Sequence, residues 1–179
     1  MNASSLTRFR GLKGGKNLEK TTETMIDKGI HRYCLQETWL LGSFSATIRG
    51  HLLFHHGTEK KTSQRGQASS DVATILGPDL QRVWNMAGKP PPITPASNSN
   101  FPGRMIGITL CFPNRSNKKS DKYHKRGRGR IKIFLSSIHH PVEHDEQKRF
   151  NEDLESCYNS IPRNTKLLSG QDVNTNVGI

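Results

Sequence analysis

The chain has little of the apolar material from which a large core is built. Only 32% of its 179 residues are hydrophobic and 7% are aromatic, so the core must come from a few short runs. No apolar run approaches the length of about 18 residues that indicates a membrane-spanning helix. The first residues also lack the apolar segment of a secretory signal. We therefore expect an intracellular protein, nuclear or cytoplasmic, that forms one domain or part of a larger one.

Cysteine is scarce as well. The three cysteines, Cys34, Cys111 and Cys157, are odd in number and far apart, which excludes a disulfide framework and does not match the spacing of a zinc site. Because Cys34 and Cys111 lie within apolar runs, we expect them to be core thiols in a reducing compartment.

Acidic residues are few beside basic ones. The chain has 15 Asp and Glu against 27 Lys and Arg, a formal net charge of +12. Such a balance favours a polyanionic partner, most simply DNA or another nucleic acid, although a merely soluble surface is the alternative.

The basic residues are densest between positions 114 and 130, where we expect a hairpin loop. The candidate nucleic-acid-binding residues there are Lys118, Lys119, Lys122, Lys125, Arg126, Arg128 and Arg130. A loop of this kind can follow a nucleic-acid backbone without reading its sequence. The alternatives are a hairpin tip that its charge keeps soluble and a nuclear-targeting patch.

Hydrophobic periodicity predicts two helices and six strands. The expected helices span 16–28 and 145–158, and the expected strands span 30–37, 46–54, 72–76, 104–112, 130–139 and 166–169. Residues 89–103 are rich in Pro, Ser and Asn and predict a loop. Because hairpin-like neighbours alternate with a strand–helix–strand unit, the order predicts an α/β or α+β sandwich rather than an all-β fold.

Polar side chains follow several of these apolar strands. They are Asn2, Glu37, His139 with His140, and Asp172 with Asn174. Strand ends are suitable places for a functional site because the sheet fixes their geometry. Each position also has an ordinary interpretation, as a solvated strand end or as a turn residue.

The residues around these positions resemble the endonuclease/exonuclease/phosphatase superfamily, and most closely the endonucleases of non-LTR retrotransposons. YCLQETWL (33–40) is similar to the family's apolar strand that ends in Gln-Glu-Thr. LLSGQDVNTNVG (167–178) is similar to its strand that runs into Gly-Asp-x-Asn. MNASSL at the start and SSIHHP (136–141) are similar to two further strand ends, and residues 65–73 resemble the Arg-Gly lead-in to a strand of the retrotransposon branch.

This resemblance implies part of a four-layer α/β sandwich with two mainly antiparallel sheets flanked by helices. It also implies hydrolysis of DNA phosphodiesters with Mg²⁺, or Mn²⁺, as cofactor. By the resemblance Glu37 is the metal ligand, Asp172 orients or deprotonates the attacking water, and Asn174 and Asn2 position the phosphate. His139 occupies a position that is usually Tyr, and an imidazole retains the ability to bind a phosphate.

The chain departs from the family pattern after Asp172. A Ser-Asp-His motif follows the Gly-Asp-x-Asn motif in the family, and this sequence stops at Ile179 without it. We therefore expect residues 1–179 to be a truncated domain with impaired catalysis. A non-catalytic nucleic-acid-binding fragment and a phosphate-ester hydrolase of the same superfamily are the alternative functions.

Overall fold

The computed structural model describes residues 13–38, 40–58, 71–96, 99, 101, 103–113, 130–141 and 143–172, with the backbone alone at 13–16 and 172. The elements are α1 (Lys13–Lys28), β1 (Arg32–Gln36), β2 (Phe44–Ile48), β3 (His51–His56), β4 (Val72–Leu76), α2 (Pro78–Met86), β5 (Met105–Pro113), β6 (Arg130–His139), α3 (His144–Asn159) and β7 (Thr165–Asp172). None of the described helices is both long and apolar enough to cross a membrane.

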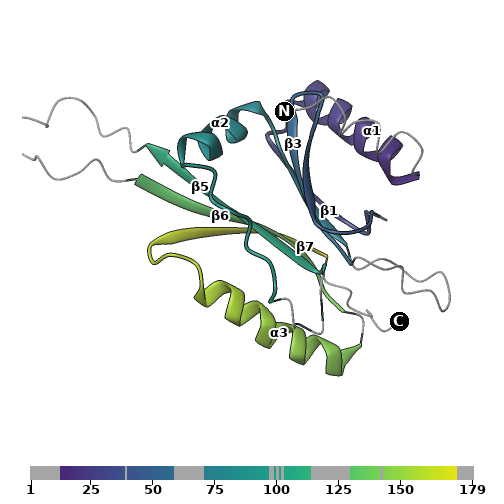
Figure 1. Ribbon diagram of the computed structural model, residues 1–179, viewed down its shortest axis with the longest axis vertical. Coiled ribbons are helices and arrows are strands. Elements are labelled where there is room, and N and C mark those ends of the chain that lie inside the picture. Colours follow the sequence, from purple (N-terminus) through teal and green to yellow (C-terminus); the bar gives the residue numbers. More distant parts are fainter. Residues whose placement is uncertain are drawn as a thin grey trace, which may run out of the picture.

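The strands form two sheets that face each other (Figure 1). The first sheet is antiparallel, with the order β1-β4-β3-β2. The second has the order β5-β6-β7, in which β5 and β6 are antiparallel and β6 and β7 are parallel. Two parallel strands need a crossover connection, and α3 provides it. The described chain is therefore a mixed α/β fold whose strand pairs are mainly antiparallel, as predicted.

Three apolar clusters hold these layers together. Between the sheets, side chains such as Leu52, Ile106 and Leu135 form a common core. On the outer face of the first sheet, α1 inserts Leu18 and Met25 against strand residues. On the outer face of the second sheet, α3 contributes Phe150, Leu154 and Cys157 (Figure 1). Because each helix has one apolar stripe, it covers one face of one sheet.

Gly107 shows how tightly the second sheet packs. A Cβ atom at this position of β5 would lie only 1.9 Å from Cζ of the buried Phe134 ring on β6. The absence of a side chain at 107 lets the ring cross β5 and reach the cluster under α3. Glycine is therefore required here for close packing.

One prediction about local structure was wrong, and one helix was not predicted. The single strand expected over 46–54 is a hairpin, in which Arg49 and Gly50 turn the chain with φ values of 48° and 79°. Such values at both central residues are typical of the two-residue turn that matches the twist of paired strands. Helix α2 was not predicted, although Pro78 suits a first helical position and Leu80, Val83 and Trp84 pack against the core.

Candidate functional site

The ends of β1, β6 and β7 meet at one end of the two sheets. Gln36 at the end of β1 donates a hydrogen bond from Nε2 to the carbonyl oxygen of Ile138, at 3.4 Å. In the parallel pair of β6 and β7, His139 is in register with Asp172. The fold thus brings positions 37, 139 and 172 together from distant parts of the sequence.

Glu37 has an unusual backbone conformation for a residue with a side chain. Its φ is 50°, in the left-handed region, and its N–H donates a hydrogen bond of 2.9 Å to the carbonyl oxygen of Asp71. This conformation costs about 1–2 kcal/mol for a residue other than glycine. The side chain is 48% exposed, so its carboxylate can reach a ligand from solvent. Strain of this kind is commonly retained at functional positions.

His139 lies next to this carboxylate. Its Nε2 is 3.9 Å from Oε1 of Glu37, and its side chain is only 6% exposed. Its backbone is fixed by the residue before β5, since its N–H donates to the carbonyl oxygen of Arg104 at 2.9 Å. The interpretation of His139 as a solvated strand end is therefore wrong. His140 is half-buried and packs edge-on against the Phe150 ring.

The residue after Glu37 is anchored to β3 through a buried histidine. Thr38 Oγ1 lies 2.6 Å from Nε2 of His55, and the other ring nitrogen of His55, Nδ1, lies 2.8 Å from the carbonyl oxygen of Gly42. A carbonyl only accepts hydrogen bonds, so Nδ1 carries the proton. Nε2 of the neutral ring then accepts a hydrogen bond from the Thr38 hydroxyl. Burial lowers the pKa of His55 to about 4, against a smaller opposite effect of the Gly42 hydrogen bond, so this neutral form persists at neutral pH.

Asp71 completes the surroundings of this anchor. It is fully buried, and its backbone carbonyl is the acceptor for Glu37. A Cβ at Gly57 would lie 2.8 Å from both Oδ1 of Asp71 and Cε1 of His55. Gly57 therefore leaves the space in which the carboxyl and the imidazole approach each other.

Sequence reasoning did not find the roles of Thr38, His55 and Asp71. Two signals were present in the sequence: histidines at both ends of the short apolar run in HLLFHH of β3, and a lone acid before the buried strand VATIL. Neither signal identifies a partner by itself.

Side chains behind the site fix β1 against the second sheet. Arg32 donates from Nη2 to the carbonyl oxygen of Ser136 at 2.6 Å, and Ser137 Oγ donates to the carbonyl oxygen of Leu35 at 3.2 Å. A Cβ at Gly170 would meet Cys34 Sγ at 2.7 Å, so this glycine allows β1 and β7 to approach closely. Burial raises the pKa of the Cys34 thiol, which favours the neutral form.

Several predicted site residues are not placed by the structure. Asn2, Asn174 and the basic residues 118, 119, 122, 125, 126 and 128 lie outside the described residues, and Asp172 is described by its backbone alone. Arg130 is described and exposed. It begins β6 whereas His139 ends it, which separates the two by about 30 Å at the usual rise of a strand. The fold therefore does not bring Arg130 to the Glu37 site.

The side chains at the site are better suited to a cation that keeps most of its water ligands than to a metal ion enclosed by several protein ligands. Among the described residues no group of three or more His, Cys, Asp or Glu side chains is arranged to hold a metal ion. Glu37 alone offers a half-exposed carboxylate. Mg²⁺ keeps several water ligands and often binds through one or two carboxylates, so this donor set fits it.

Comparison with known proteins found no relative of this chain. No family model matches the chain, and neither the curated proteins nor the solved structures gave a significant match.

Proposed function

We propose that the Glu37 site hydrolyses phosphodiesters of DNA with the help of Mg²⁺, or of Mn²⁺ in its place. The observation that carries the proposal is the strained Glu37, held by Asp71 at a strand end with the buried His139 3.9 Å from its carboxylate. A carboxylate beside an imidazole, fixed by two sheets, is suited to a reaction that handles a charged phosphate and a proton.

Each residue has a role in this proposal. Glu37 would hold the cation, which when bound offsets negative charge on the phosphate and the leaving oxygen. His139 would donate a hydrogen bond to a phosphate oxygen. Asp172, in register with His139, would orient or deprotonate the attacking water. Asn174 and Asn2 would position the phosphate, as the resemblance to the endonuclease/exonuclease/phosphatase superfamily implies.

The arrangement of the layers supports the same family. Helix α1, two facing sheets and helix α3 follow one another across the molecule (Figure 1). We infer that they are part of a four-layer α/β sandwich of the kind this superfamily has. The strand ends that carry Glu37 and His139 then correspond to the family's site.

Nicking of supercoiled plasmid tests this function. We expect nicking by the wild type in millimolar Mg²⁺ and none in EDTA, with a loss of about 100-fold or more in the Glu37→Gln variant. Glu23→Gln is the matched control, because both glutamate side chains are 48% exposed and Glu23 lies on α1, where it pairs with Arg49. Equal Mg²⁺-dependent nicking by the wild type and Glu37→Gln would contradict the proposal.

A second candidate is a non-catalytic nucleic-acid-binding module. The net charge of +12 favours it, as does the exposed Arg130 at the start of β6, far from Glu37. Salt-sensitive DNA binding that neither EDTA nor Glu37→Gln changes, together with no nicking, would support this candidate instead.

A further inference from the structure

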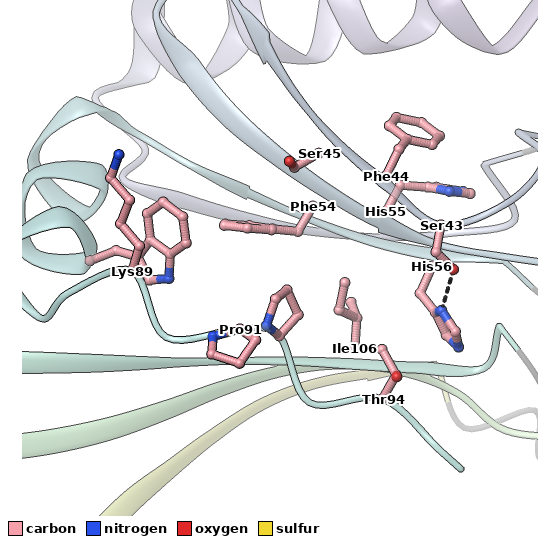
Figure 2. A pocket seen from close by; sticks show the side chains of 12 residues that line it. Ser43, Phe44, Ser45, Phe54, His55, His56, Lys89, Pro91, Thr94 and Ile106 are labelled. Atoms are coloured by element: carbon pink, nitrogen blue, oxygen red, sulfur yellow. Dashed lines mark hydrogen bonds between the residues drawn. The ribbon is translucent and has the colours of Figure 1, made fainter. Parts of the chain in front are cut away.

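A hollow among the described residues begins at His56, near the end of the first sheet that carries Glu37. It is a groove of about 480 Å³ between β2 and β3 of the first sheet and β5 of the second, lined on the β5 side also by the segment that follows α2. Its volume falls in the range of small-ligand pockets, about 300–1,000 Å³. In Figure 2, Pro91, Thr94 and Ile106 line one side, and Phe54 and His56 of β3 line the other.

The walls of the groove are mainly apolar, and its ends are polar. Trp84 and Pro91 supply partly exposed rings, while the buried Phe54 ring supports Trp84 edge-on with the ring centroids 5.1 Å apart. Trp84 Nε1 already donates to the carbonyl oxygen of Pro90 at 3.0 Å. Aromatic rings of this kind stack against nucleic-acid bases, and the stacking depends little on which base is bound.

Lys89 stands at one end of the groove and His56 at the other (Figure 2). Nδ1 of His56 lies 2.7 Å from Ser43 Oγ, while its Nε2 is enclosed and makes no hydrogen bond to another described residue. None of the described residues that line the groove carries a carboxylate. A ligand with an aromatic plane, hydrogen-bonding edges and negative charge matches these walls and ends.

The groove leads toward the end of the sheets that carries Glu37. His56 pairs with Val72, and Val72 pairs on its other side with Gln36, the residue before Glu37. Two strand spacings separate the backbones of His56 and Gln36, which is about 10 Å. A nucleic-acid strand whose phosphate lies at Glu37 can therefore place a neighbouring nucleotide in the groove.

We propose that this groove binds an unpaired nucleotide of a nucleic-acid strand, with the base against Trp84 and Pro91 and a phosphate at Lys89. The assignment to a strand, rather than to a free nucleotide, rests on the proposed phosphodiesterase function of the Glu37 site. Single-stranded or locally opened DNA is then the preferred substrate.

Binding of an oligo(dT) strand in EDTA tests the groove without any catalysis. Trp39→Phe leaves Trp84 as the only tryptophan, so its fluorescence reports on the groove. Ser45→Ile places a branched side chain at the groove on a strand that tolerates it, and Thr47→Ile is its control on the same strand outside the groove. We expect saturable quenching, with affinity reduced at least about 5-fold by Ser45→Ile and unchanged by Thr47→Ile.

A separate pair of variants tests the positive charge of Lys89. Lys89 has a φ of 56°, so Lys89→Asn removes the cation with a residue that tolerates this backbone. Its matched control is Arg49→Asn, at φ 48° in the β2–β3 turn away from the groove. We expect Lys89→Asn alone to weaken binding and to lower the salt dependence by the contribution of one phosphate, about 0.7 in slope.

The outcomes separate this inference from the proposed function. Unchanged binding in Ser45→Ile and Lys89→Asn, or no quenching of Trp84, overturns the groove as a nucleotide site. Equal affinity for free dTMP and for oligo(dT) overturns the assignment to a strand. Binding that Glu37→Gln leaves intact supports the groove independently, while the loss or retention of nicking in that variant decides the catalytic proposal.

Discussion

Acid should destabilise this fold chiefly through His55. The folded protein holds the ring neutral between Thr38 and Gly42, and burial lowers its pKa from 6.5 to about 4. The unfolded chain therefore takes up a proton before the folded one does as the pH falls. The contribution of His55 to stability is fully present above about pH 6.5 and is lost progressively down to about pH 4. Below that pH, His55 causes no further change in the unfolding free energy.

The magnitude follows from the shift. The difference of 6.5 − 4 is 2.5 pKa units, and at about 1.36 kcal/mol per unit it corresponds to about 3 kcal/mol of unfolding free energy. Two titratable groups lie beside His55: His56, whose pKa burial also lowers, and the buried Asp71. His56 adds to the loss in acid, so only a comparison of variants isolates the contribution of His55.

Urea unfolding followed by circular dichroism, from neutral pH to about pH 4, measures this contribution. We expect the wild type to lose about 3 kcal/mol more than His55→Gln over this range. His31→Gln, at a side chain that is 66% exposed, should keep the wild-type pH dependence. Parallel pH dependence of the wild type and His55→Gln would refute the reasoning, as would a change of the same size in Asp71→Asn alone.

Three further predictions concern individual positions. Glu37→Gly should raise the unfolding free energy by about 0.5–1 kcal/mol, because glycine tolerates a φ of 50°, and this substitution should also remove any stabilisation of the fold by Mg²⁺. Urea unfolding with and without Mg²⁺ measures both effects. A large destabilisation would show that the Glu37 backbone is not strained. Gly107→Ala should cost about 1–3 kcal/mol or more in urea unfolding, because its Cβ would overlap the Phe134 ring; an unchanged midpoint would contradict the packing. Leu168 is 55% exposed on the edge strand β7. Leu168→Lys should change the unfolding free energy by no more than about 0.5 kcal/mol and should reduce light scattering on heating, because a charge on an edge strand opposes aggregation. A large loss of stability would show that the Leu168 side chain is covered.

Long periodic segments were predictable from the sequence, and local reversals were less so. The spacing of Phe150, Leu154 and Tyr158, four positions apart, indicates α3 directly, and the structure buries Phe150 and Leu154 on this helix. The β2–β3 hairpin was missed because Arg49 is not a typical residue for a left-handed turn position. Helix α2 could have been predicted, since Leu80, Val83 and Trp84 are spaced as in a helix. It was missed because the helix is short and Gly77-Pro78 was interpreted only as the end of the preceding strand.

The candidate site was predictable in its residues and not in its geometry. Glu37 and His139 were selected as polar residues at strand ends and received their roles from the resemblance. Their proximity depends on contacts between residues 102 apart, such as Gln36 with Ile138. No periodicity in the sequence specifies such a pairing. His55 anchors Thr38 from 17 positions away, and this too follows only from the sheet. The roles of Asn2, Asn174 and the basic loop 114–130 stay predictions.

The most direct test of the central claim is thermal unfolding of the 179-residue chain in EDTA and in millimolar Mg²⁺, with Glu37→Gln and Glu23→Gln alongside. A ligand that binds only the folded state raises the melting temperature. We predict that Mg²⁺ raises the melting temperature of the wild type and of Glu23→Gln but not of Glu37→Gln. An equal increase in all three proteins, or none in the wild type, would contradict the assignment of Glu37 as the metal ligand.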